Sequence, residues 1–186
     1  MNKRRTCTLM LLCAFCLPAQ RLDLSHLDRL DEKARERVNV NLNRDLLQVA
    51  GKLLSPSDPD QARVKALVGK LESVHVRAFE FDQAGAYTQN DVEVIRRKLR
   101  APGWHRIVDV RSKEDGENVD IYLHLAGANV DGVAILAASP RELTVVNIVG
   151  PINLEDLAAL GGQFGIPKLP QGQKAEPTSD RKKDED

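Results

Sequence analysis

The side chains that could perform acid–base chemistry are spread along the whole chain and do not gather in one motif. The four histidines fall in four different predicted elements, and none has the spacing of metal ligands. His124, Asp120 and Glu142 lie at or near strand ends, and they would form a hydrolytic site only if strand pairing brought them within hydrogen-bond reach. There is no G-x-S-x-G elbow and no Walker loop. We therefore predict no catalytic residues, no metal ion and no cofactor, and a hydrolase built from strand ends stays an alternative.

The segment 139–151 carries the polar residues with the strongest claim to a binding role. Arg141 and Glu142 stand where two apolar strands meet, and Asn147 interrupts the second of these strands. Such groups either form an ion pair and satisfy exposed backbone atoms, or they anchor a ligand or a partner strand. Arg141, Glu142 and Asn147 are accordingly the predicted binding residues.

The first 19 residues have the pattern of a secretory signal peptide. Three basic residues at positions 3–5 precede an apolar run at 6–17, which is short for a membrane span. We predict cleavage after Ala19 and a periplasmic or secreted protein. Two alternatives remain: a lipoprotein modified at Cys16 or Cys13, and an uncleaved anchor. Without lipidation, membrane anchoring is not expected.

The composition is that of one soluble domain. The chain has 186 residues, 42% of them hydrophobic and 29% charged, with 27 basic and 27 acidic side chains. Balanced charge and few aromatic residues argue against nucleic acid as a partner. Removing residues 1–19 takes away three basic residues, which leaves a formal charge of −3, and it takes away all three cysteines. The mature chain would therefore have no thiol chemistry and no disulfide.

Apolar spacing predicts helices in the first half of the domain. Leucines, an alanine and a valine recur at helical spacing over residues 24–38, with Ser25 as a candidate cap, although 38–42 alternates and could equally be extended. A second helix is expected over 46–54, with its leucines facing inward. Asp58 should cap a third helix, and Thr88 with Asp91 a fourth.

Five strands are predicted from β-branched and alternating segments, and they cover residues 73–82, 104–111, 119–125, 133–138 and 143–149. Turn residues between the last four indicate an antiparallel meander. In 119–125 the apolar residues point to one face, while Asp120, Tyr122 and His124 point to the other, which is expected to meet water or a partner. A short helix should follow from Asn153.

These elements predict an α+β fold, with an antiparallel sheet of about five strands packed by amphipathic helices on one face. The expected organisation is a signal peptide at 1–19, a single domain at 20–167 and a disordered, charged tail at 168–186.

Four motifs in order resemble the bacterial family filed as domain of unknown function 4252, and they occupy residues 79–82, 101–108, 140–151 and 160–167. The resemblance implies export in bacteria, often as a periplasmic protein or lipoprotein, and frequent association with envelope-stress sigma-factor systems. It assigns no catalytic residues. This chain departs from the lipoprotein members because it has no good lipobox.

The signal peptide and the lack of a reactive motif together favour a non-catalytic, extracytoplasmic binding or sensing module of the bacterial envelope. The family resemblance implies a link between this module and sigma and anti-sigma regulation. Its expected partner is an unidentified envelope protein. Besides the hydrolase, an envelope assembly or chaperone factor is an alternative, in which the helical stretch 24–71 lends an apolar stripe to a client.

Overall fold

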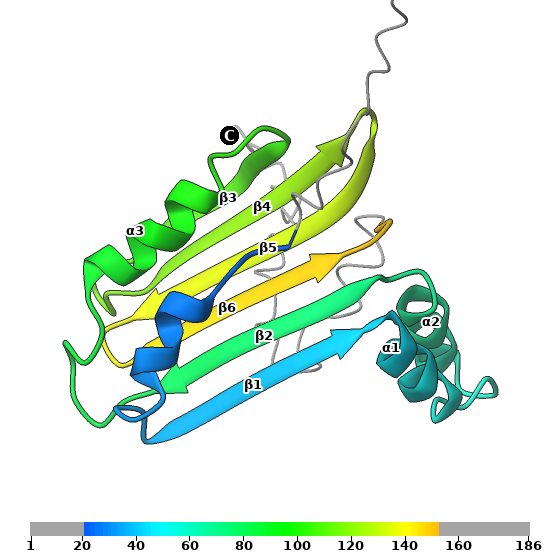
Figure 1. Ribbon diagram of the computed structural model, residues 1–186, viewed down its shortest axis with the longest axis horizontal. Coiled ribbons are helices and arrows are strands. Elements are labelled where there is room, and N and C mark those ends of the chain that lie inside the picture. Colours follow the sequence, from blue (N-terminus) through cyan, green and yellow to red (C-terminus); the bar gives the residue numbers. More distant parts are fainter. Residues whose placement is uncertain (1–20, 153–186) are drawn as a thin grey trace, which may run out of the picture.

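The computed structural model describes residues 21–152, which form a single antiparallel sheet with helices around it (Figure 1). The sheet has six strands in the order β1-β2-β6-β5-β4-β3, so an α+β fold is confirmed with one strand more than expected. The last four strands are joined in sequence as an antiparallel meander, as predicted. The strands are β1 (Glu36–Asn43), β2 (Ser73–Glu80), β3 (Trp104–Arg111), β4 (Asn118–Ala126), β5 (Asn129–Ser139) and β6 (Glu142–Val149).

The additional strand, β1, lies where the sequence offered either a helix end or an extended piece. The expected first helix is only a short 3-10 helix, η1 (Ser25–Leu30), and Ser25 is not its cap. Val38 and Val40 alternate with Asn39, and β-branched residues in alternation favour a pleated strand over a helix. The prediction of one helix over 24–38 was therefore wrong.

Two of the other helices begin at the predicted caps, whereas α1 begins two residues before the expected range, at a cap that was not predicted. Asn43 caps α1 (Arg44–Lys52) by accepting a hydrogen bond from the backbone N–H of Leu46. Asp58 caps α2 (Pro59–Val68), and Thr88 and Asp91 form the capping box of α3 (Gln89–Lys98). These short polar side chains satisfy N–H groups that have no partner inside the helix.

One face of α1 differs from the prediction. The leucines of 46–54 were expected to point inward, but Leu46 is 49% exposed and Leu53 is 84% exposed. Val49 completes this exposed apolar face. Only Leu47 and Gly51 are buried, because α1 packs on α2 through that side alone and lies beyond the ends of β1 and β2 (Figure 1).

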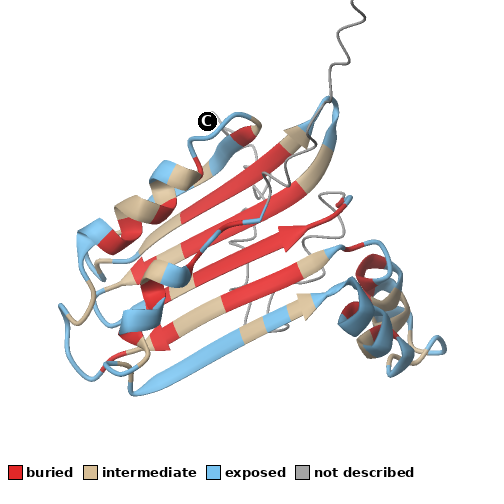
Figure 2. Ribbon diagram, viewed as in Figure 1, coloured by how far each residue is buried: buried red, intermediate tan, exposed pale blue. Residues whose placement is uncertain are grey.

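Hydrophobic residues pack on both faces of the sheet, in two clusters within residues 21–152. Figure 2 shows that the central strands are mostly buried, whereas β1 at the edge is mostly exposed. The first cluster joins the even-numbered side chains of β2 and β6 to α1 and α2. It contains Leu47, Val64, Leu67, Val68, Leu71, Val74, Val76, Ile121, Leu123, Val133, Ile135, Val146, Ile148 and Ile152. The second cluster joins the opposite face to residues 22–30 and α3. It contains Leu22, Leu24, Leu27, Leu30, Phe79, Phe81, Val92, Ile95, Leu99, Trp104, Tyr122, Ala134, Leu136, Ala138, Leu143 and Val145.

This second cluster overturns the prediction of an open polar face on β4. Asp120 is completely buried, Tyr122 is buried, and His124 is only 9% exposed. Alternation placed these three residues on one face correctly. It could not show that η1 and α3 cover that face, because both come from distant parts of the chain.

Several predicted features lie outside the described residues: the signal peptide at 1–19 with Ala19, Cys13 and Cys16, the helix expected from Asn153, the end of the domain at 167 and the tail at 168–186. Within residues 21–152, no helix has the length and apolar character needed to cross a membrane.

Candidate functional site

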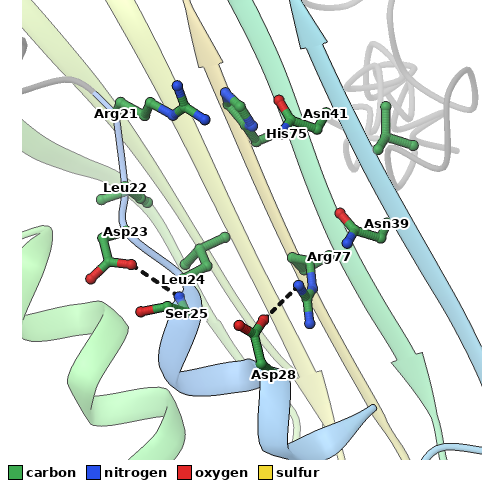
Figure 3. A pocket seen from close by; sticks show the side chains of 11 residues that line it. Arg21, Leu22, Asp23, Leu24, Ser25, Asp28, Asn39, Asn41, His75 and Arg77 are labelled. Atoms are coloured by element: carbon green, nitrogen blue, oxygen red, sulfur yellow. Dashed lines mark hydrogen bonds and ion pairs between the residues drawn. The ribbon is translucent and has the colours of Figure 1, made fainter.

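A cavity of about 480 Å³ lies between the first described residues and strands β1 and β2 (Figure 3). We call it the N-terminal pocket. Its lining consists of Arg21, Leu22, Asp23, Leu24, Ser25, Asp28, Asn39, Val40, Asn41, His75 and Arg77. The volume falls within the range typical of small-molecule sites, roughly 300–1,000 Å³.

The outer wall of the pocket is the segment 21–25, which is held on the sheet by one buried amide. The backbone N–H of Leu22 donates to Oδ1 of Asn147 at 2.9 Å, and Leu22 and Leu24 insert into the second hydrophobic cluster. The side chain of Asp23 binds Nζ of Lys98 at 3.2 Å, which ties the segment to α3. Polar and apolar contacts therefore hold the same five residues in place.

The floor of the pocket is a polar row that crosses neighbouring strands. In the strand register, His75 of β2 stands opposite Asn41 of β1 and opposite Asn147 of β6. Arg77 stands opposite Asn39 in the same way. Opposite residues of an antiparallel pair place their side chains on the same face. The amides of Asn39 and Asn41 therefore lie beside the imidazole and the guanidinium (Figure 3).

Two nitrogen atoms of this floor are buried and have no hydrogen-bond partner: Nε2 of His75 and Nε of Arg77. The other nitrogens of Arg77 are occupied, because Nη1 binds Asp28 at 2.8 Å and Nη2 binds Asp31 at 2.8 Å. A buried polar atom without a partner is costly, and such atoms cluster where a ligand or ordered water completes the site.

Burial, together with the positive charge of Arg21, holds the pKa of His75 below its ordinary value. The imidazole is therefore neutral at pH 7, with one nitrogen that donates and one that accepts. Hydrogen bonds from Ser25 and Lys98 lower the pKa of Asp23, so its carboxylate is ionised. The lining thus carries two positive charges, Arg21 and Arg77, against two negative ones, Asp23 and Asp28. A balanced, hydrogen-bonding site of this kind suits a small polar molecule without net charge.

Of the predicted binding residues, only Asn147 lies next to this pocket, where it holds Leu22. Glu142 begins β6, five residues or about 17 Å along the strand from Asn147, and Arg141 precedes it. They line a separate cavity of about 450 Å³ with Asp115, Glu117, Ser139 and Pro140. Arg141 and Glu142 are both exposed, and no buried side-chain atom without a partner lies there among the described residues. The N-terminal pocket is therefore the stronger candidate.

The structure does not bring together the three residues of the hydrolase alternative. Asp120 and His124 are four residues apart on β4, a separation of about 13 Å along the strand. Asp120 of β4 pairs with Leu136 of β5, whereas Glu142 of β6 pairs with Ser139 of β5. Glu142 is therefore separated from Asp120 by strand β5 and by three residues along it.

The two buried members of that trio have other partners. Asp120 accepts hydrogen bonds from Arg96 at 3.0 Å, Arg111 at 2.5 Å and Arg106 at 3.3 Å. His124 contacts Asp131 through Nδ1 at 2.6 Å and stands edge-on to the ring of Trp104. Asp120 therefore neutralises a cluster of arginines, and His124 is oriented by a different carboxylate.

Strand pairing does not gather the three strand histidines, because His105 pairs with Leu123, next to His124, and so points to the opposite face from His124. His75 lies on β2, whereas His105 and His124 lie on β3 and β4, at the other side of the sheet. Across residues 21–152, no three His, Cys, Asp or Glu side chains are placed to hold a metal ion.

Most of the pocket residues were missed at the sequence level. The predicted binding residues do not include His75, Asn39 or Asn41, because the histidines show no clustered spacing and residues 38–42 could equally be extended or end a helix. The signal that could have found them is the alternation over 38–42, since it places both asparagines on the face opposite Val38 and Val40.

The comparisons with known proteins identify the family and nothing further. No curated protein matches the chain, and neither does any solved structure. The family model described as domain of unknown function (DUF4252) matches residues 32–160, which is more than half of the chain. The match includes β1, β2 and the polar row of the pocket floor, and begins after the outer wall. The chain therefore belongs to the DUF4252 family.

Proposed function

We propose that this protein is a non-catalytic, extracytoplasmic binding or sensing module of the bacterial envelope, and that the N-terminal pocket takes a small polar ligand without net charge. The observation that carries the proposal is His75, which lines the cavity and whose buried Nε2 has no hydrogen-bond partner. The extracytoplasmic location rests on the signal-peptide pattern of residues 1–19.

The chemistry of the lining defines the ligand class. The amides of Asn39 and Asn41 each offer a donor and an acceptor, and His75 offers one donor and one acceptor in its neutral form. Nε of Arg77 adds a donor. A ligand with carbonyl and hydroxyl or amide groups, such as a monosaccharide, a simple amide or a dipeptide, would satisfy these groups.

A sensing role would couple this site to a protein partner. The segment 21–25 both lines the pocket and is held by Asn147, so a bound ligand adds contacts to a segment that the sheet anchors through few polar bonds. Ligand binding would therefore favour the docked segment over the released one. The link to envelope-stress sigma and anti-sigma regulation rests on the family resemblance.

The test is isothermal titration calorimetry of the purified protein against monosaccharides, simple amides and dipeptides. At least one of them should bind, and Asn41→Ala should weaken that binding at least fivefold, because Asn41 is exposed in the pocket. Asn129→Ala, at the exposed first residue of β5, should have no effect. The absence of heat from all three classes, or equal binding by Asn41→Ala, would contradict the proposal.

The exposed apolar face of α1 favours a second candidate function, an envelope assembly or chaperone factor. Leu46, Val49 and Leu53 are 49%, 55% and 84% exposed and share one side of the helix. Under this candidate, the wild-type protein should suppress aggregation of a heat-denatured client, and replacing all three residues by Ser should abolish the effect. Ile107→Ser, at an exposed apolar site on β3, is the control. Equal suppression by the triple variant would dispose of this function.

A further inference from the structure

Strand β1 forms an edge of the sheet that no other described strand covers. It is the first strand in the order β1-β2-β6-β5-β4-β3, and it pairs only with β2 within residues 21–152. All eight of its residues pair in register with β2 without a bulge. Most of β1 is exposed (Figure 2), and Val38 is 38% exposed. One row of backbone N–H and C=O groups therefore faces outward, and no strand of the described part of the chain pairs with it.

The opposite edge, β3, carries the features that block such pairing. Its register with β4 shifts between Arg106 and Val108, which marks a bulge or irregularity. Its exposed charged residues include Arg106, Asp109 and Arg111. Bulges and charges are the usual protection of an edge strand. The central part of β1, residues 38–42, has neither.

The sequence of β1 is complementary to itself in the antiparallel direction. When Val40 is placed opposite Val40 of a second copy, Val38 comes to lie opposite the partner's Leu42, and Asn39 opposite the partner's Asn41. Glu36 then stands opposite the partner's Arg44, the residue that follows β1 and begins α1, where its guanidinium also binds Glu72 at 3.4 Å. Each end of the pair therefore brings one acidic and one basic side chain together. Apolar residues meet apolar residues, amides meet amides, and acidic side chains meet basic ones.

We propose that β1 pairs with β1 of a second copy about a twofold axis at Val40, giving a dimer with one continuous sheet. A twofold pair uses the same edge on both chains, so the assembly is closed at two copies. Asn39 and Asn41 line the N-terminal pocket, so the partner's Asn41 adjoins its mouth and the two pockets flank the axis. The dimer does not depend on the pocket's ligand, and its failure would leave the proposed function standing.

Cysteine cross-linking tests the register. In the full chain with Cys7, Cys13 and Cys16 replaced by Ser, Val40→Cys should form a disulfide-linked dimer on air oxidation. Opposite residues of an antiparallel pair have Cα atoms roughly 4.5–5.5 Å apart, within disulfide reach. Val38→Cys alone should not cross-link, since its two copies are about 13 Å apart. Mixing Val38→Cys with Leu42→Cys should restore the cross-link.

A charge exchange tests the dimer without cysteines. Sedimentation should show a dimer for the wild-type chain, and Glu36→Arg should weaken it about tenfold by placing like charges at both ends of the pair. Combining Glu36→Arg with Arg44→Glu should restore the dimer. Both positions are exposed, so the folded monomer should survive each change. A wild-type monomer at all concentrations, an open series of larger species, or equal cross-linking by Val38→Cys would overturn the proposal.

Discussion

The backbone N–H of Leu22 donates a hydrogen bond to the side chain of Asn147 at 2.9 Å, across 125 positions of sequence. Asn147 is completely buried in β6, and its register partner in β2 is His75. One polar residue in a strongly apolar strand thus fixes the segment that forms the outer wall of the pocket. This contact explains why an amide lies in the centre of the sheet.

Replacing Asn147 by Leu, which has a similar size, should lower the free energy of unfolding by about 1–3 kcal/mol, because the buried N–H of Leu22 loses its acceptor. Urea denaturation measures this change. Asn41→Ala is the matched control, since Asn41 is exposed and its removal should change stability by less than about 0.5 kcal/mol. Equal stability of Asn147→Leu and the wild type would show that the bond does not hold the segment.

Replacing Asp120 by Asn should be more damaging. Asp120 is completely buried and contacts Arg96, Arg106 and Arg111, so the loss of its charge leaves three guanidinium groups without a common partner. We expect a loss of about 3–5 kcal/mol, measured by chemical denaturation.

Asp109 provides the control for that variant. It binds Arg106 and Arg111 at 2.8 Å each, but its side chain is 41% exposed. Asp109→Asn should cost less than about 1 kcal/mol, because solvent screens exposed ion pairs. Similar losses for the two variants would mean that burial of Asp120 does not determine its contribution.

A side chain at position 103 should disturb His124. Gly103 has a φ of +90°, and a Cβ there would overlap Nε2 of His124. Gly103→Ala should therefore cost about 2–4 kcal/mol, from backbone strain and overlap together. Gly127→Ala is the control: Gly127 has a φ of +65° but open space around it, so only the strain of about 1 kcal/mol remains.

The double variant Gly103→Ala/His124→Ala identifies the overlap as the cause of the larger loss. Removing the imidazole also removes the overlap, so the two changes together should cost less than the sum of their separate effects. Thermal unfolding of the four proteins measures this difference, and strictly additive losses would argue against the overlap.

Stability should fall as the solution is acidified, partly because of His75. Burial lowers the pKa of His75 from its ordinary 6.5 in the folded protein. Below pH 6.5 the imidazole of His75 takes up a proton in the unfolded chain but resists protonation in the folded chain. The free energy of unfolding is therefore highest above about pH 6.5 and decreases as the pH falls toward the pKa of the folded protein. Burial lowers the pKa of His26 as well, with the same consequence.

His75→Gln should therefore reduce the change in the free energy of unfolding between about pH 7 and pH 5. Urea titrations at both pH values measure that change. Asn129→Ala, an exposed position without a titratable group, is the control and should leave the pH dependence as in the wild type. An unchanged dependence in His75→Gln would show that His75 is not buried in solution as it is in the structure.

The sequence predicted local structure better than it predicted contacts between distant segments. Thr88 with Asp91, and Asp58, determine their helix starts through neighbouring N–H groups, and both caps are confirmed. The alternation of β4 correctly separated Asp120 from Ile121. What covers each face depends on η1 and α3, which no local pattern links to β4.

The pocket was missed for the same physical reason. Its floor exists only because β1 pairs with β2 in a register that sets Asn41 beside His75, and its wall only because Asn147 captures Leu22. Both contacts join segments that are far apart along the chain. The alternation over 38–42 leaves an extended piece open beside the helix that leucine spacing predicts over 24–38, but neither pattern indicates which strand would pair with it.

Nuclear magnetic resonance of the His75 side chain tests the central claim most directly, because its Nε2 has no partner in the free protein. The imidazole nitrogens of uniformly ¹⁵N-labelled protein would be followed during titration with monosaccharides, simple amides and dipeptides, and His75→Gln would assign the signal. If the N-terminal pocket is the binding site, a ligand that binds shifts the Nε2 resonance of His75 in a saturable way and leaves His105 unchanged. Saturable binding that leaves the His75 resonance unmoved would contradict the account.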